Sequence, residues 1–163
     1  GCLAYAVVKV SGAKRNDVVV DPLCKDGVIA IEAALSGVKR VYAFDSNKNN
    51  VRNAVINVRF AKVGVQVNAY DLDWLDTVFK RGMVDRVVTN VFVSRRDEDA
   101  VARIRELFHQ SEFVMKHDMT LITNRPEVVR EVARERFREV MAVKVSKGDM
   151  RYEILKFERN SHP

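Results

Sequence analysis

The sequence predicts an α/β fold in which a mostly parallel sheet carries helices on both faces and ends in an antiparallel hairpin strand. Two observations support this prediction. Between residues 17 and 136, short runs rich in β-branched residues alternate with segments of helical periodicity, which is typical of a parallel sheet. Two further β-rich runs, at about 138–146 and 150–158, are separated only by Lys147, Gly148 and Asp149, and this short connection predicts a hairpin.

The composition fits one globular domain over residues 1–163. The hydrophobic fraction is 47% and the charged fraction 31%, and no run of about 18 apolar residues suggests a membrane span. Cys2 and Cys24 make neither a disulfide framework nor a metal site, so we expect a cytoplasmic protein. The net charge of +6 is compatible with a nucleic-acid partner. Abundant Arg and Glu with little Gln favour a thermophilic source.

The first unit of the sheet is a buried strand over 17–21, a short polar turn and a helix over 27–36 that stops at Gly37. Such a turn exposes backbone N–H groups at a helix N-terminus, which suits an anionic or polar ligand. Residues 3–11 fit either a short helix or a strand, and 12–16 form a loop. Later strands are predicted at 40–44, 65–69, 84–90 and 119–123. Later helices are predicted at 47–62, where Ser46 is the cap, at 97–115 and at 126–136. A turn or short helix is predicted at 72–81, and an irregular segment at 91–96.

Polar residues at strand ends are the candidates for ligand binding, because ligands of such sheets lie across the carboxyl ends of the strands. Asp21, Asp45, Asp71 and Asn90 end the first four strands. Asp45 follows Asp21 by 24 residues (45 minus 21), close to the spacing of about 20 at which an acid binds ribose hydroxyls. The alternative for Asp45 is a helix cap beside Ser46. Asp71 fits either an acceptor for an adenine amino group or a turn acid.

The turn after the first strand contains three further candidates. Pro22 fixes the turn, and Gly27 would let a ligand approach the backbone. Cys24 fits a small apolar packing residue better than a nucleophile, because no histidine lies near it in the sequence. A Rossmann dehydrogenase is disfavoured, since G-x-G-x-x-G does not follow the strand.

These residues resemble a known family. Residues 21–34 read D-P-L-C-K-D-G-V-I-A-I-E-A-A and resemble motif I of the THUMP-associated RNA methyltransferases, D-P-F-C-G-S-G-T-x-x-I-E-A-A. Residues 42–57 resemble that family's G-x-D-x-[ND] stretch. Asp71 matches the acid that follows the family's third strand, and Asn90 matches the first residue of its strand-four motif. Residues 147–155 resemble its closing strand. The resemblance covers nearly the whole chain.

The resemblance implies a Rossmann-like class I methyltransferase fold with a seven-stranded sheet and S-adenosyl-L-methionine as cofactor. It implies methylation of a guanine amino group in tRNA or ribosomal RNA, with the target base entering beside Asn90. Asp45 would take the ribose hydroxyls, Asp71 the adenine amino group, and the turn 22–27 the methionine part. The implied cofactor-binding residues are Asp21, Pro22, Cys24, Gly27, Asp45, Ser46 and Asp71, and the implied catalytic residues are Asn90 and Phe92.

Two departures from the family pattern fall on its functional motifs. Lys25 and Asp26 replace the glycine and serine of C-G-S-G. After Asn90, the family's P-P-[YF] is replaced by Val-Phe-Val, so that Phe92 stands one position before the usual aromatic residue and strand alternation would turn it to the opposite face.

These departures keep an alternative function open. The alternative is an inactive protein of the same fold that binds RNA or a partner subunit through Arg95, Arg96, Arg103 and Arg105, unless nearby acids pair with these residues. The family's RNA-binding THUMP domain, which normally precedes this one, is absent from the chain, so we expect a further RNA-binding domain or subunit.

Overall fold

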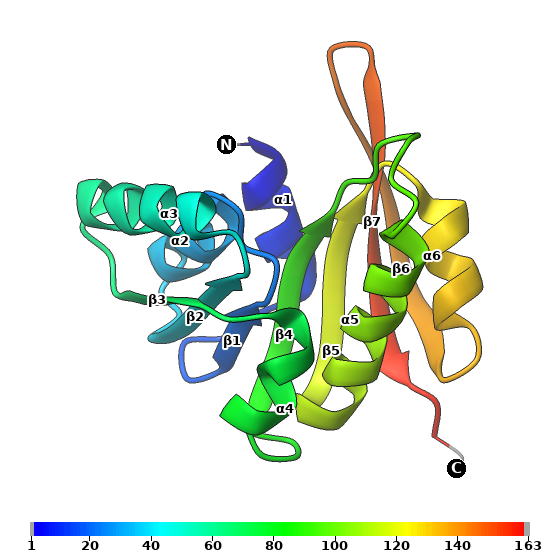
Figure 1. Ribbon diagram of the computed structural model, residues 1–163, viewed down its shortest axis with the longest axis horizontal. Helices are drawn as coiled ribbons and strands as arrows, with labels where there is room; N and C mark the ends of the chain where they lie inside the picture. Colours follow the sequence, from blue (N-terminus) through cyan, green and yellow to red (C-terminus); the bar gives the residue numbers. More distant parts are fainter. Residues whose placement is uncertain (1, 162–163) are drawn as a thin grey trace.

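A computed structural model, which describes residues 2–161, contains a seven-stranded sheet between two layers of helices (Figure 1). The strand order is β3-β2-β1-β4-β5-β7-β6, parallel from β3 to β5, with β7 antiparallel to both of its neighbours. The strands are β1 (Val18–Asp21), β2 (Arg40–Asp45), β3 (Val65–Ala69), β4 (Val84–Val91), β5 (Met115–Thr123), β6 (Phe137–Lys147) and β7 (Met150–Arg159). The helices are α1 (Cys2–Ser11), α2 (Val28–Leu35), α3 (Lys48–Ala61), the 3-10 turn η1 (Leu72–Trp74), α4 (Leu75–Val78), α5 (Ala100–Val114) and α6 (Pro126–Ala133).

Each face of the sheet has its own hydrophobic core. In β1, Val19 packs into the core under α1, α2 and α3, whereas Val20 packs into the core under α4, α5 and α6. Both valines are buried, because successive side chains of a strand point to opposite faces and this sheet is covered on both. The central strands are therefore apolar on both faces, which explains why their sequences are nearly continuous apolar runs.

The strand order creates a switch point beside β1. The chain leaves β1 to build β2 and β3 on one side, then crosses to build β4 and β5 on the other. The carboxyl ends of β1 and β4 thus flank the crevice where open α/β sheets bind their ligands. The predicted fold class is confirmed by this topology.

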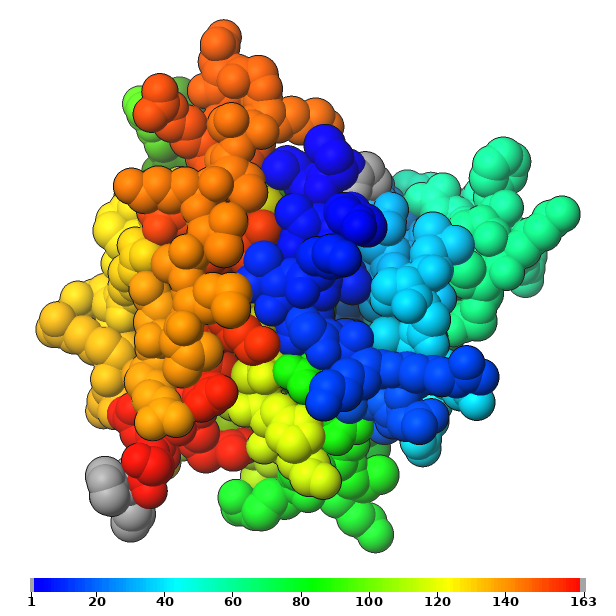
Figure 2. All heavy atoms as spheres, turned by 180° about the vertical axis from the view of Figure 1, so that it is seen from behind, coloured from blue at the N-terminus to red at the C-terminus, as the bar shows by residue number. Residues whose placement is uncertain are grey.

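The first segment, which fitted a helix or a strand, is the helix α1. From behind, α1 (blue) lies between the orange β6 and the light-blue α2 (Figure 2). Its last residue, Ser11, anchors it, because the Ser11 carbonyl accepts hydrogen bonds from Arg86 Nη1 (3.1 Å) and Lys156 Nζ (3.2 Å). Among the helices of residues 2–161, none combines the length and the apolar character needed to cross a bilayer.

Several predicted boundaries were wrong, for local and for tertiary reasons. The cap of α3 is Asn47, not Ser46, because the Asn47 side chain accepts the N–H groups of Asn49 (2.9 Å) and Asn50 (3.0 Å). The predicted helix over 97–115 begins at residue 100 and ends at 114, and β5 begins at 115 rather than 119, since this segment pairs with β4 along its whole length. Helix α6 ends at residue 133 rather than 136.

Candidate active site

The carboxyl ends of β1, β2 and β4 meet around a small cavity of about 190 Å³. Four of the predicted site residues line it, namely Asp45, Ser46, Asn90 and Phe92. Lys25 from the turn after β1 and Asn50 from α3 also contribute to its walls, and α5 closes the side opposite the turn. The remaining predicted residues, Asp21, Pro22, Cys24, Gly27 and Asp71, do not line this cavity.

Asp45 is the acid at the centre of the site. It ends β2, and only 9% of its surface is exposed. Its Oδ2 accepts the backbone N–H of Lys25 (2.9 Å), and its Oδ1 accepts the N–H of Asn47 (2.9 Å) and the amide of Asn50 (3.3 Å). These bonds fix the carboxylate between the turn and α3. Because two carboxylate oxygens offer about four acceptor positions, Asp45 retains capacity for a ligand hydroxyl.

The turn over residues 22–27 is held by backbone and packing contacts. The Cys24 N–H donates to the Phe44 carbonyl (2.8 Å), and the Asn57 amide donates to the Asp26 carbonyl (2.9 Å). Gly27 has a φ of 87°, and a Cβ added there would lie 3.1 Å from the Cβ of Ala54. A glycine is therefore required at 27 by the turn and by the contact with α3, whereas the sequence suggested ligand approach as its reason.

Lys25 occupies the position where the resembling family has glycine. Its φ is 50°, so the lysine keeps the left-handed backbone that glycine favours. Its side chain is exposed, and Nζ lies 5.2 Å from the ring centroid of Phe92. Lys25 thus spans the crevice from the β1 turn to the segment after β4, and it lines the cavity together with Asp45.

Three predicted site residues, at the end of β1 and within this turn, are buried, namely Asp21, Pro22 and Cys24. Burial raises the pKa of Asp21 to about 7, although its Oδ1 accepts hydrogen bonds from Thr89 Oγ1 (2.5 Å) and from the Leu23 N–H (3.1 Å). Burial also raises the pKa of the Cys24 thiol far above its ordinary value, so Cys24 is a packing residue here rather than a nucleophile.

Asn90 presents an unpaired acceptor at the end of β4. Its Oδ1 is buried and has no hydrogen-bond partner within residues 2–161. Leaving a buried acceptor unpaired costs about 1–3 kcal/mol, so such atoms in folded proteins are often explained by a ligand or an ordered water. Asn90 also lines the cavity, so an unpaired acceptor lies at its wall.

Phe92 has the orientation that strand alternation predicts. It packs with the core under α1–α3, whereas Val91 and Val93 pack with the opposite core. The Phe92 ring contacts Tyr152 of β7, with ring centroids 5.0 Å apart and planes at 31°. Sequence reasoning missed Tyr152, because no local pattern tells which hairpin residue reaches the segment after β4. Asn50 was missed as well, although its place in the first turn of α3 after Asp45 was a usable signal.

Asp71 lies outside the cavity, whereas Arg103, one of the four arginines considered for RNA or partner binding, lines it. Asp71 is exposed, and its backbone caps η1 without a side-chain cap bond. Arg103 is bonded to Asp97 (2.5 Å), which is not one of the acids Glu98, Asp99 and Glu106 that the alternative named as partners. Arg95 and Arg96 are exposed and form no ion pair within residues 2–161.

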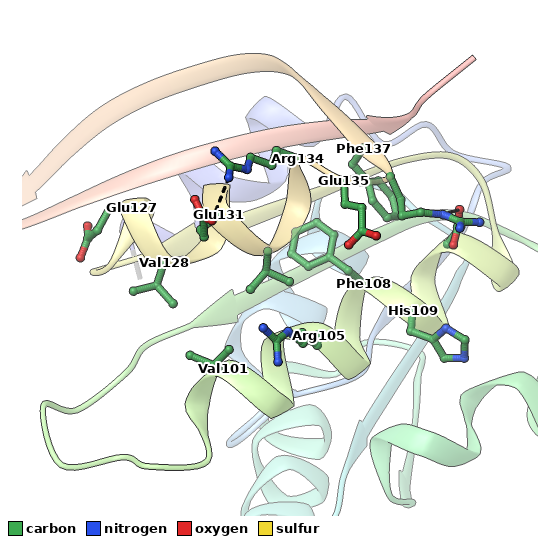
Figure 3. Close-up of a pocket in the computed structure, with 13 residues that line it drawn as sticks. Val101, Arg105, Phe108, His109, Glu127, Val128, Glu131, Arg134, Glu135 and Phe137 are labelled. Carbon is green, nitrogen blue, oxygen red and sulfur yellow. Dashed lines mark hydrogen bonds and ion pairs between the residues drawn. The ribbon is translucent and has the colours of Figure 1, made fainter. Parts of the chain in front are cut away.

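A larger hollow, of about 1240 Å³, lies between α5 and α6, away from the strand ends. Figure 3 shows that its walls carry apolar side chains, such as Val101 and Val128, as well as charged ones, such as Arg105 and Glu131. None of the predicted site residues lines this hollow. The polar groups that could orient a ligand gather in the smaller cavity, so we place the candidate active site there.

Comparisons with known proteins identify relatives of this chain. It is 33% identical over 95 residues to "Ribosomal protein L11 methyltransferase" of Anoxybacillus flavithermus (56% of this chain, 30% of the relative). It is 24% identical over 106 residues to "tRNA (guanine(6)-N(2))-methyltransferase THUMP3" of Bos taurus (58% of this chain, 21% of the relative). The chain thus spans less than a third of the length of either relative.

Solved structures share its fold. TrmN of Thermus thermophilus superposes with a TM-score of 0.84 at 22% identity, covering 96% of this chain and 48% of TrmN. A methyltransferase described as SMU.472 and complexed with SAH superposes with a TM-score of 0.78 at 16% identity, covering 99% of this chain and 53% of that one. Residues 2–153 match the UPF0020 family, described as the RMKL-like methyltransferase domain. Because the match extends over most of the chain, this protein belongs to the RMKL-like methyltransferase domain family.

Proposed function

We propose that this chain is an S-adenosyl-L-methionine-dependent RNA methyltransferase domain whose target is a guanine amino group in tRNA. The unpaired Oδ1 of Asn90, a residue that lines the candidate cavity, is the observation that carries this proposal. An amide oxygen accepts from an exocyclic amine, and guanine N2 is such a donor. The names of two relatives add support, since one is a tRNA guanine-N2 methyltransferase and another structure was solved with SAH.

The polar groups of the site suit the ribose end of the proposed cofactor. Asp45 is a fixed carboxylate with spare acceptor capacity, and Ser46 and Asn50 stand beside it. The cavity of about 190 Å³ is smaller than the roughly 300–1,000 Å³ typical of ligand pockets. Lys25 spans the crevice and is exposed. Among residues 2–161, its ammonium group makes a cation–π contact with Phe92 and no ion pair, so its movement would widen the site.

In this proposal the chain acts mainly by positioning. The cofactor, when bound, would supply an electrophilic methyl group. Asp45 would bind the ribose hydroxyls, and Asn90 would accept one N–H of the target amine and fix its orientation. Holding two reactants in line accounts for a large part of the rate enhancement in such reactions. The proposed roles of Asp71 with the adenine amino group and of residues 21–27 with the methionine part remain predictions.

A calorimetric titration of S-adenosylmethionine into the purified chain tests the cofactor assignment. We expect Asp45→Ala to weaken binding by at least ten-fold, because a charge-assisted hydrogen bond to a ribose hydroxyl is lost. Asp73→Ala removes an exposed acid that does not line the cavity and serves as the matched control. Lys25→Gly should bind the cofactor at least as tightly as the wild type, since glycine accepts the same backbone conformation and clears the crevice.

The outcomes separate the proposed function from its alternatives. Equal binding by the Asp45→Ala and Asp73→Ala variants would refute the ribose assignment. No binding at millimolar cofactor by the wild type or by Lys25→Gly would favour the inactive scaffold. If cofactor binds, transfer of a labelled methyl group to unmodified tRNA, compared with transfer to ribosomal protein L11, distinguishes an RNA substrate from a protein substrate.

A further inference from the structure

The β6–β7 hairpin extends past the carboxyl edge of the sheet, next to the candidate site. The pairing of β5 with β7 stops at Thr123 and Glu153, whereas β6 and β7 continue to pair as far as Lys147 and Met150. Figure 1 shows the hairpin end standing clear of the helices, on the side where β4 ends. Within residues 2–161, the β7 edge of this extension is not paired with β5, and its side chains other than the half-buried Val145 and Tyr152 are exposed.

Tyr152 connects the extended hairpin with the candidate site. Its ring packs against Phe92, with centroids 5.0 Å apart, and Lys25 Nζ lies 5.2 Å from the Phe92 centroid. Both rings are only half-buried. Each aromatic side chain therefore keeps exposed surface that a further planar group could cover.

Tyr152 also lines an open hollow of about 650 Å³ between the hairpin and the segment that joins β5 to α6. That segment contributes Asn124 and Pro126, and the hairpin contributes Lys144 and Arg151. The aromatic pair connects the hollow with the small cavity, because Tyr152 lines the hollow and Phe92 lines the cavity. The Tyr152–Phe92 pair thus lies between the hairpin hollow and the cavity that Asn90 lines.

The hairpin end carries more positive than negative charge. Lys144, Lys147 and Arg151 are exposed, and none of them forms an ion pair within residues 2–161. The acids there are Asp149 at the tip and Glu153, and Glu153 is already bonded to an arginine of α6 (2.9 Å). Unpaired cations on an exposed extension contribute little to folding stability, which indicates that they bind a partner outside the chain.

The loop after β4 does not add to this positive charge. Arg95 and Arg96 are exposed there, but Glu98 and Asp99 follow within the same loop and are exposed as well. The positive charge near the Tyr152–Phe92 pair therefore comes from the hairpin and from Lys25.

We propose that the hairpin end, through Lys144, Lys147, Arg151 and the Tyr152–Phe92 pair, is an RNA-binding surface that guides a single-stranded segment to Asn90. This inference rests on the proposed function and names the part of the chain that holds its substrate. Cations that contact phosphates, combined with aromatic rings that stack on unpaired bases, are the elements of single-strand RNA recognition. Tyr152 is a positioning residue in this scheme, because it supports Phe92 and offers its own ring to a base.

The charge contribution is tested by anisotropy titrations of a labelled, unmodified tRNA transcript with the full chain, without cofactor, at several salt concentrations. The test variant is Lys144→Glu, Lys147→Glu and Arg151→Glu combined. The matched control is Arg15→Glu, Lys39→Glu and Lys80→Glu, which changes the net charge equally at exposed positions near the amino ends of the strands. We expect the hairpin variant to lose at least ten-fold in affinity and the salt slope to fall by roughly 2. The control should stay within about three-fold of the wild type.

The aromatic contribution is tested with Tyr152→Ala and Tyr152→Phe in the same assay. Loss of one stacking ring should weaken RNA binding by about ten-fold in the alanine variant, whereas the phenylalanine variant keeps the ring and the affinity. Thermal unfolding of both variants verifies that the hairpin still folds.

Equal losses in the two glutamate triples would mean that only net charge matters and would overturn the proposal.

Other outcomes are equally decisive. Unchanged RNA affinity in the hairpin triple would overturn the proposal and leave the hairpin as a surface for another class of partner, such as an acidic protein. The cofactor titration gives an independent readout. If RNA binding depends on the hairpin but the wild type binds no S-adenosylmethionine, the proposed enzymatic function fails while this inference stands.

Discussion

Asp21 is a carboxyl group that the fold keeps out of water at the point where β1 ends. Only 2% of its surface is exposed, and its pKa is raised to about 7 by burial. Its Oδ1 is bonded to Thr89 and to the turn, so the side chain fastens the turn under the candidate site. These contacts of Asp21 are structural, and the cofactor-binding role that the resemblance implies remains a prediction.

The raised pKa predicts how Asp21 changes stability with pH. In the unfolded chain the carboxyl loses its proton near pH 3.8, whereas in the folded state it keeps the proton until about pH 7. The folded state thus binds more protons between pH 4 and pH 7, and stability contributed by this group falls as pH rises through that window. Asp21→Asn keeps an acceptor oxygen and removes the titration.

Urea denaturation of both proteins from pH 4 to pH 8 measures this effect. Relative to Asp21→Asn, the wild-type free energy of unfolding should fall by up to roughly 4 kcal/mol between pH 4 and pH 7, at about 1.4 kcal/mol per unit of pKa difference. Parallel curves for the two proteins would show that Asp21 does not titrate in this window.

Of the four candidates that the strand-end criterion selected, two line the cavity, whereas Asp21 and Asp71 do not line it. Asp45 and Asn90 were expected at the carboxyl edge because they end strands, and both line the cavity. Prediction from sequence failed where the contact is made by a distant segment, as for Tyr152, whose approach to Phe92 depends on the register of β7 with β5 and of β5 with β4. The functions assigned to these residues remain predictions.

Among the elements, α3 carries a strained end that makes its stability testable. Lys62, the C-cap residue directly after α3, has a left-handed backbone with a φ of 58°, a conformation that costs a non-glycine residue about 1–2 kcal/mol. Lys62→Gly should raise the free energy of unfolding by about 0.5–1 kcal/mol after the greater entropy of the unfolded glycine is counted. Denaturant unfolding at neutral pH measures this difference.

Arg52→Gly is the matched control for this substitution. Arg52 is an exposed residue in the interior of the same helix, where glycine should destabilise by about 1 kcal/mol. Opposite signs for the two glycine variants would support backbone strain at Lys62. A loss of stability in both would mean that the Lys62 side chain stabilises the helix end by contacts that exceed the strain.

The types of nearly all elements followed from periodicity, but their boundaries depended on contacts that no local pattern contains. The predicted helix ends at residue 115, and residues 116–118 are assigned to no predicted element. In the fold, residues 115–118 form the first part of β5, because Met115 pairs with Val84 of β4. Pairing with a strand that is far away in the sequence overrides local preference, and no local pattern in the sequence reveals that pairing.

At the scale of the whole molecule, a network of charges ties α1 to the amino edge of the sheet. Arg86 of β4 bonds Asp17 before β1 (2.8 Å) and Asp118 of β5 (2.7 Å), and it also donates to the Ser11 carbonyl at the end of α1. Lys156 of β7 approaches the same Asp118 (3.7 Å). The network therefore joins segments from both ends of the chain, at the edge opposite the candidate site.

Arg86→Met tests how far the fold depends on this network. The Arg86, Asp17 and Asp118 side chains are only 12%, 13% and 6% exposed, so removing the arginine leaves two poorly solvated carboxyls. Breaking such a pair costs about 3–5 kcal/mol, and we expect that loss in the free energy of unfolding. The control is Arg138→Met, which removes an ion pair with Glu158 on the exposed face of the hairpin and should cost less than about 1 kcal/mol. Similar losses in both variants would mean that burial adds nothing to the Arg86 network, whereas the expected difference would show that this buried network stabilises the fold more than an exposed ion pair does.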